Sequence, residues 1–194
     1  MQLNREIALL FGLSVLALAR LLETFVPDKV KIQGKIVAAW TMNCLGISWF
    51  VVFALSLTEH YLVLRHFNWL AGIGLFLIAV RLVVKLWAMK ALGDYWSIQV
   101  EIRDEQKLVS TGPYKYVRHP SYLSTMTELT AIPLIAGAYY TLIYVWLVHF
   151  SLILIRIHYE ERELRRKFGS DYDLYRRRTF ALLPLPKERL MNVI

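Results

Sequence analysis

The sequence contains little charge and almost no cysteine for its length. Charged residues make up 20% of the 194 residues, and hydrophobic residues make up 57%, above the roughly 45–50% of soluble domains. The single cysteine, Cys44, excludes an internal disulfide framework and a zinc site built from cysteines. Neither glycine-rich fingerprint for nucleotide phosphates is present. This composition excludes an ordinary soluble domain and indicates an integral membrane protein.

Acidic residues are fewer than basic ones. The 23 lysines and arginines exceed the 15 aspartates and glutamates, which gives a formal net charge of +8. Positive charge can attract nucleic acid, but in so apolar a chain it more often lies beside anionic lipid headgroups. We therefore expect the lipid bilayer as a partner, and neither nucleic acid nor an obligatory protein partner.

Long uncharged runs predict an all-α polytopic membrane protein with about five transmembrane helices. The clearest run, residues 36–58, has 23 residues without a formal charge, enough to cross a hydrocarbon core of about 30 Å. A helix within residues 1–26 and another over 69–89 complete an N-terminal part of three helices. We expect the whole chain, residues 1–194, to be a single membrane domain.

A helical hairpin is predicted in the second half of the chain. Residues 121–155 carry one formal charge, Glu128, and are long enough for two helices but too long for one. Pro133 and the Gly137-Ala138 pair mark a turn region, which places the two helices over roughly 121–137 and 139–158.

The distribution of lysine and arginine orients these helices. Three lysines follow the first helix, and ten lysines and arginines occur from residue 156 onward. The positive-inside rule places both segments, and the C-terminus, in the cytoplasm. The expected location is the cytoplasmic membrane of a bacterium or archaeon, or the endoplasmic reticulum membrane of a eukaryote.

Two polar segments, residues 90–120 and 159–194, fall on the cytoplasmic side, so we expect residues 90–194 to carry the chemistry. Leu164, Phe168 and Tyr172 keep one apolar stripe. This spacing predicts that the last helix continues into water from Glu160 to Tyr175.

The densest group of reactive side chains is Arg118-His119-Pro120-Ser121-Tyr122, preceded by Gly112-Pro113-Tyr114. Proline fixes φ and disfavours helix in the residue before it, so a rigid loop with free backbone N–H groups is expected here. Such donors suit a polar ligand. In the alternative interpretation, Arg118 and His119 face lipid phosphates and the tyrosines form an interfacial belt.

A second group lies at the end of the last predicted membrane helix. Arg156 and Glu160 are four residues apart, so they share a helix face and could form a simple intrahelical pair. Alternatively, an arginine at the membrane edge that faces the bundle interior is a candidate functional residue.

These groups and their surroundings resemble the isoprenylcysteine carboxyl methyltransferase family of integral membrane enzymes. The resemblance covers about residues 90–185 and preserves the order and spacing of the family's elements. The matching elements are Leu92-Gly93-Asp94-Tyr95-Trp96-Ser97, Lys107 to Tyr114, Arg118 to Tyr122, and Arg156-x3-Glu160-Glu161-x6-Phe168-Gly169-x2-Tyr172-x2-Tyr175.

The resemblance implies that S-adenosylmethionine donates a methyl group and leaves as S-adenosylhomocysteine. It also implies that the cytoplasmic loop, the hairpin and the tail enclose this donor and that Arg156 meets the acceptor. We expect no metal, since the histidines show no metal-ligand spacing. One departure is Gln106, where the family often has histidine. The implied donor contacts are Gln99, Gln106, Lys107, Leu108, Val109, Tyr114, His119, Pro120, Ser121, Tyr122 and Glu160.

The expected acceptor is a lipid that enters sideways from the bilayer, but its chemistry stays open. A prenylated cysteine carboxylate is already ionised and needs no general base. A ring hydroxyl on a small lipid does need one, and His119 and Glu128 are then the candidates. In either case Tyr122 and Glu160 must face the same pocket.

Two other functions stay open. One is a membrane reductase for sterol-like lipids, in which Arg176 to Arg178 would hold the 2′-phosphate of NADPH. The other is a scaffold without enzymatic activity that binds anionic lipid through its basic face.

Overall fold

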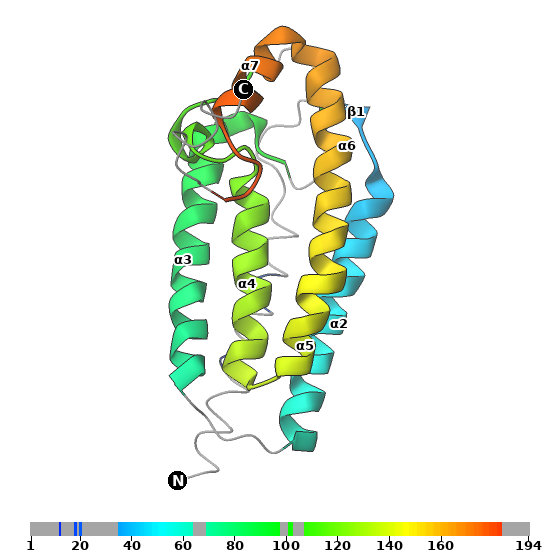
Figure 1. Ribbon diagram of the computed structural model, residues 1–194, viewed down its shortest axis with the longest axis vertical. Helices are drawn as coiled ribbons and strands as arrows, with labels where there is room; N and C mark the ends of the chain where they lie inside the picture. Colours follow the sequence, from blue (N-terminus) through cyan, green and yellow to red (C-terminus); the bar gives the residue numbers. More distant parts are fainter. Residues whose placement is uncertain are drawn as a thin grey trace, which may run out of the picture.

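Helices α2 (Ala39–Val63), α3 (Trp69–Leu92), α4 (Pro120–Ala136) and α6 (Phe150–Phe168) lie side by side along the long axis of the computed structural model (Figure 1). The structure describes residues 12, 18, 20, 35–63, 69–97, 101–102 and 107–183. The helix predicted within residues 1–26 therefore falls almost entirely outside the described residues.

Three helical stretches are long and apolar enough to cross a membrane among the residues that the structure describes. They are Ala39–Val63, Trp69–Tyr95 and Tyr139–Phe168. In the most apolar 18 residues of each stretch, only 17 to 33% of the residues are buried inside the protein. Because so much apolar surface is left exposed, these helices need lipid around them. The prediction of an all-α polytopic membrane protein is confirmed.

Helix α4 lies at the centre of the bundle, between α3 and α6 (Figure 1). It has 17 residues, most of them buried, and Leu129 and Ile132 pack in one apolar cluster with Trp49 and Val52 of α2 and Ile153 of α6. Since α4 is surrounded by other helices, its contacts with them position the residues at its first turn.

The predicted hairpin turn forms at Gly137. This residue has φ 69°, a left-handed conformation that glycine adopts without strain, and it ends α4. Pro133 lies inside α4, and its carbonyl accepts a hydrogen bond from the Ala138 N–H at 2.8 Å. The Glu59 carboxylate of α2 accepts from the backbone N–H of Thr141 at 2.8 Å, which ties the hairpin turn to α2.

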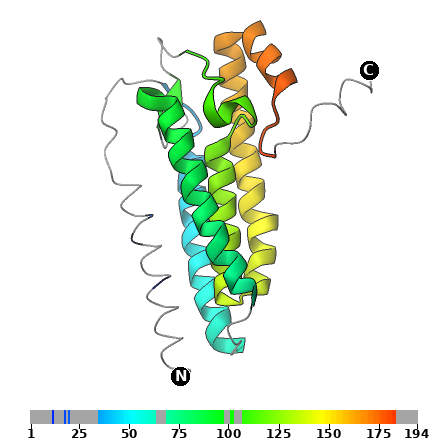
Figure 2. The same ribbon diagram turned by 90° about the vertical axis from the view of Figure 1, so that its left-hand side faces the viewer.

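After the turn, helix α5 (Tyr139–Tyr144), the π-helical segment η3 (Val145–His149) and α6 form one continuous helix. It ends at Phe168, because Gly169 adopts φ 53° and α7 (Ser170–Arg178) begins in a new direction. The prediction of one helix through Tyr175 is therefore wrong. Helix α7 turns back beside the end of α6 (Figure 2), and Tyr172 becomes buried.

Short elements gather at the same end of the bundle as α7. They are the antiparallel pair β1 (Lys35–Ile36) and β2 (Glu101–Ile102), in which Lys35 faces Ile102, and the 3₁₀ turns η1 (Gly93–Tyr95) and η2 (Gly112–Lys115). This end thus combines the polar loop, the start of α4 and the C-terminal tail, which is the arrangement expected for the cytoplasmic side.

Candidate functional site

A chain of hydrogen bonds joins three helices at this end and is centred on Arg156 of α6. The Arg156 Nε donates to the Tyr122 hydroxyl at 2.8 Å, and one terminal nitrogen donates to Thr41 Oγ1 of α2 at 2.8 Å. The Tyr122 hydroxyl in turn donates to Glu160 Oε2 at 2.7 Å. We call Thr41, Arg156, Tyr122 and Glu160 the Arg156 chain. Arg156 is 1% exposed, so these contacts fix its guanidinium within the bundle.

The chain replaces the simple intrahelical pair considered from the sequence. The Tyr122 hydroxyl bridges Arg156 and Glu160, and the guanidinium also lies over the Tyr122 ring at 5.9 Å from its centroid. Tyr122 and Glu160 are in direct contact, and the pocket that both should face stays a prediction. Thr41 carries no signal in the sequence, because a threonine at the start of an apolar helix has many other uses.

His119 lies beside two adjacent glutamates of α6, Glu160 and Glu161. Its Nε2 is 3.2 Å from Glu161 Oε1, its Nδ1 is 3.8 Å from Glu160 Oε2, and its ring stacks on Tyr122 with centroids 5.6 Å apart. The His119 side chain is buried, whereas the Glu160 side chain keeps 26% of its surface exposed. Glu160 is therefore accessible to a polar ligand that approaches this end of the bundle.

Glu161 holds the C-terminal tail. Its Oε1 accepts from Arg118 Nε at 2.8 Å, and its Oε2 pairs with Arg176 Nε of α7 at 3.1 Å. Arg118 also donates to the carbonyls of Arg176, at 3.3 Å, and Thr179. We call Arg118, Glu161 and Arg176 the tail clamp. It fixes α7 against the start of α4.

The residues after α7 run beside the Arg118-His119-Pro120 segment. The Arg118 N–H donates to the Phe180 carbonyl at 2.8 Å, and the His119 N–H donates to the Ala181 carbonyl at 3.0 Å. The expectation of free backbone N–H groups is therefore wrong at these two residues. The physical reason is that buried amides are paired almost without exception, and the tail supplies the acceptors that the sequence pattern does not show.

Tyrosines of the loop and of α7 pack beneath the tail. The Tyr175 hydroxyl donates to the Tyr114 carbonyl at 2.7 Å, which links α7 to η2. Burial raises the pKa of both Tyr114 and Tyr175 well above the ordinary value. Both hydroxyls therefore stay protonated and act as hydrogen-bond donors at physiological pH.

The other predicted donor contacts are distributed over the loop and the first turn of α4. Lys107 is exposed, and Leu108 and Val109 are half-buried in an irregular segment. Pro120 begins α4 and is buried, with Ser121 next to it. Gln99 and Gln106 lie outside the described residues.

Glu128, one of the two candidate bases, lies deeper in the bundle. Its carboxylate pairs with Arg81 Nε of α3 at 2.9 Å and accepts from Trp49 Nε1 at 3.2 Å, and Arg20 is 3.6 Å away. Both carboxylate oxygens are therefore engaged by other side chains. His119, beside the Arg156 chain, is the better placed of the two candidates.

Comparison with known proteins now identifies the family. Residues 70–166 match the profile of the isoprenylcysteine carboxyl methyltransferase (ICMT) family. The chain belongs to this family. The matched region contains Arg118 to Tyr122, Arg156 and Glu160, so it includes most of the site described above.

Curated relatives agree with this assignment. The uncharacterized Bacillus subtilis protein YpbQ is 31% identical over 140 residues, which cover 71% of this chain and 83% of the relative. The protein-S-isoprenylcysteine O-methyltransferase of Xenopus laevis is 29% identical over 132 residues, 67% of this chain and 46% of that enzyme. The chain thus spans about half the length of the vertebrate enzymes it matches.

A solved structure shows the same fold. It is that of the eukaryotic intramembrane Ras methyltransferase ICMT, which superposes with a TM-score of 0.63 at 24% identity. The alignment covers 73% of this chain and 52% of that structure. The two proteins therefore share the helical membrane fold.

Proposed function

We propose that this protein is an integral membrane methyltransferase that transfers a methyl group from S-adenosylmethionine to a lipidic acceptor. The observation that carries the proposal is the Arg156 chain, which places a buried guanidinium two hydrogen bonds away from a partly exposed carboxylate. Glu160 is suited to the ammonium or ribose hydroxyls of the donor. Arg156 is suited to a carboxylate on the acceptor, because its planar guanidinium presents paired donors.

The residues at this end fit such a donor chemically. A sulfonium is attracted to aromatic faces, and the stacked rings of Tyr122 and His119 lie beside Glu160. When bound, the donor supplies an activated methyl group. The remaining task of the protein is to align the two reactants, which is worth about 7–11 kcal/mol, against about 1–2 kcal/mol from aromatic contacts.

The proposed reaction is a single displacement. An acceptor oxygen forms a bond to the methyl carbon, the bond from that carbon to sulfur breaks, and its electron pair stays on sulfur as a neutral thioether. A carboxylate acceptor is already ionised, so no proton moves. A hydroxyl acceptor must lose its proton, and His119 would take it.

The structure also bears on the reductase alternative. Arg176, the first of the three arginines considered for a 2′-phosphate, is occupied by Glu161 in the tail clamp. A methyltransferase is therefore the function that we favour. The same proposal includes two finer assignments. The C-terminus lies in the cytoplasm, and the acceptor is a prenylated cysteine carboxylate.

Titration calorimetry of the detergent-solubilised protein tests the proposal. We expect saturable binding of S-adenosylhomocysteine and no binding of NADPH. Binding of NADPH alone would favour the reductase, and binding of neither ligand would favour the scaffold. Glu160→Gln should weaken S-adenosylhomocysteine about tenfold, the effect of losing one charged hydrogen bond. The matched control is Glu163→Gln, which lies on the same helix and pairs with Arg166.

Radioactive methyl transfer then distinguishes acceptor classes. N-acetyl-S-farnesylcysteine presents a carboxylate, and an alkylresorcinol presents ring hydroxyls. We expect a base-labile methyl ester on the first and little methyl ether on the second. The opposite preference would assign the protein to lipid hydroxyls and make His119 the residue to substitute next.

A further inference from the structure

A second polar pair joins α2 to the continuous helix formed by α5, η3 and α6, deeper in the bundle than the Arg156 chain. His149 Nδ1 lies 2.9 Å from Ser48 Oγ, and both side chains are buried. Ser48 follows Thr41 by seven residues, and His149 precedes Arg156 by seven. Because seven residues are close to two helical turns, each helix carries both of its members on one face, about 10 Å apart along the axis. We call Ser48 and His149 the Ser48–His149 pair.

The π-helical segment η3 gives Ser48 a second partner. The Tyr144 hydroxyl lies 3.4 Å from Ser48 Oγ. Tyr144 and His149 are five residues apart, which in a regular α-helix separates two side chains by about 140° around the axis. In η3 the Phe150 N–H instead donates to the Val145 carbonyl, five residues back, so this wider turn brings both side chains to the same serine. Such π-turns are rare and are found frequently at functional sites.

The surroundings of the Ser48–His149 pair are apolar. Val52, Val145 and Ile153 lie one turn from Ser48 or His149, belong to one buried cluster and have no exposed surface. A hydroxyl or an imidazole that loses its partner here finds no water to replace it. The hydrogen bond therefore opposes any sliding or rotation of α2 against η3 and α6.

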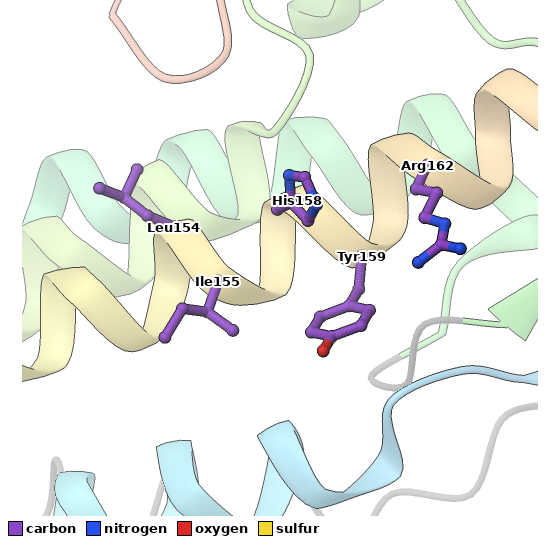
Figure 3. A pocket seen from close by; sticks show the side chains of 5 residues that line it. All are labelled: Leu154, Ile155, His158, Tyr159 and Arg162. Atoms are coloured by element: carbon purple, nitrogen blue, oxygen red, sulfur yellow. The ribbon is translucent and has the colours of Figure 1, made fainter.

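On its outer side, the contact between α2 and α6 is open. A groove of about 430 Å³ lies there, and in Figure 3 Ile155 and Tyr159 point from α6 toward α2, drawn in light blue. Ile155 is 41% exposed, so side chains on this side do not lock the two helices together. Helices α3 and α4 differ, because a Cβ at Gly74 would lie only 2.6 Å from Ile135 Cγ1. Close packing fixes α3 against α4, whereas directional hydrogen bonds set the register of α2 against α6.

We propose that the Ser48–His149 pair positions Arg156 for methyl transfer by holding α2 in register with α6. The inference rests on the proposed methyltransferase function. Thr41 Oγ1 accepts a hydrogen bond from a terminal nitrogen of Arg156 at 2.8 Å, so a shift of α2 moves this acceptor away from the guanidinium. Ser48 and His149 are thus positioning residues that act through Thr41.

The proposal separates the rate of transfer from donor binding. The side chains assigned to the donor at this end, Glu160 and His119, belong to α6 and to the start of α4, and none belongs to α2. A shift of α2 should therefore slow transfer and leave donor affinity unchanged. A reactant misplaced by about 1 Å can cost about a hundredfold in rate.

Two substitutions of His149 distinguish its two nitrogens. In His149→Asn the amide takes the place of Nδ1 and keeps the bond to Ser48, whereas in His149→Gln the amide reaches the place of Nε2. Nε2 has no hydrogen-bond partner among the residues that the structure describes. We expect kcat, with whichever acceptor the wild type methylates, to fall about tenfold in His149→Gln and less than about twofold in His149→Asn.

Calorimetry with S-adenosylhomocysteine accompanies these rates. Its affinity should stay within about twofold of wild type in both variants, because the donor contacts are untouched. Equal kcat values in His149→Asn and His149→Gln overturn the proposal. So does a loss of donor affinity in step with kcat, which a general folding defect would produce. Failure of the wild type to bind S-adenosylhomocysteine would instead contradict the methyltransferase itself.

A double-mutant cycle tests the route through Thr41. Ser48→Ala should lower kcat about tenfold in the wild-type background but less than about twofold in a Thr41→Ala background, where the contact that it positions is already lost. The matched control is Ser56→Ala. Ser56 is buried on the same helix, and its hydroxyl has no partner in the described part of the chain, so kcat should not change. Additive losses from Ser48→Ala and Thr41→Ala, or an equal loss in Ser56→Ala, overturn the positioning role.

Discussion

Two buried arginines of the bundle are held in different ways. Arg81 of α3 is 5% exposed and pairs directly with Glu128 of α4, whose other oxygen accepts from Trp49. Arg156 of α6 is 1% exposed, and it donates hydrogen bonds to the hydroxyls of Tyr122 and Thr41. Arg81 contacts Glu128 directly, and the contact from Arg156 to Glu160 runs through the Tyr122 hydroxyl.

The difference separates a structural ion pair from a candidate binding group. A direct buried pair is costly to open, because either partner left alone is an uncompensated charge in a poorly solvated interior. Hydroxyl groups hold a guanidinium in place by hydrogen bonds. An incoming carboxylate can replace these hydroxyls as the acceptor at a lower free-energy cost than opening an ion pair. We therefore expect substitutions around Arg81 to affect folding and substitutions around Arg156 to affect methyl transfer.

The largest expected effect is on stability. Glu128→Gln removes the carboxylate that pairs with the buried Arg81 and should lower the free energy of unfolding by about 3–5 kcal/mol. The double variant Arg81→Met/Glu128→Leu should recover part of this loss, because it removes both charges. Thermal unfolding in detergent measures both effects.

A surface pair provides the control for this prediction. Arg165 pairs with Asp173 at 3.0 Å, and both side chains are about half exposed. Arg165→Met should cost less than about 1 kcal/mol, the usual value for such a pair. If Glu128→Gln were as mild as Arg165→Met, the interpretation of Arg81 as a structural anchor would be wrong.

The next effect is on catalysis. Tyr122→Phe removes the hydroxyl that joins Arg156 to Glu160 and should lower kcat/KM about tenfold to a hundredfold, which corresponds to about 1–3 kcal/mol for buried groups left unsatisfied. The thermal midpoint should change little. Tyr116→Phe is the control, because Tyr116 is exposed at the same end of the bundle. A Tyr122→Phe enzyme with wild-type kinetics would show that the bridging hydroxyl is dispensable.

The smallest effect is expected at the tail clamp. Glu161→Gln weakens the ion pairs with Arg118 and Arg176, each worth about 1 kcal/mol at this partly exposed position. Trypsin should then cut more rapidly within the Arg176 to Arg178 run, and the affinity for S-adenosylhomocysteine should fall a few-fold. Glu163→Gln should leave both measurements unchanged. Unaltered cleavage in Glu161→Gln would mean that the tail is held elsewhere.

The sequence predicts α2, α3, the hairpin and the residues that gather at one end of the bundle. Long runs with few charged residues indicate α2, α3 and the hairpin. In lipid, a chain segment satisfies its backbone hydrogen bonds mainly by forming a helix. The end of α6 was missed although Gly169 carries the usual glycine signal of a helix terminus. Leu164, Phe168 and Tyr172 keep helical spacing across it, so the apolar stripe gave the stronger and misleading signal.

Contacts between distant segments were beyond prediction from the sequence. Thr41 and Arg156 are 115 positions apart, and their hydrogen bond depends on how α2 and α6 pack together. The pairing of residues 118 and 119 with residues 180 and 181 likewise depends on the direction of α7. Local patterns determine neither, because tertiary packing sets both.

The most direct test of the account is to measure donor binding and methyl transfer on the same preparation of Arg156→Lys. Lysine keeps the charge but loses the planar paired donors that suit a carboxylate. We expect transfer to N-acetyl-S-farnesylcysteine to fall by about a hundredfold, as for a misplaced reactant. The calorimetric affinity for S-adenosylhomocysteine should stay within about twofold of wild type, since Arg156 is assigned to the acceptor. Loss of donor affinity in step with loss of transfer would contradict that assignment.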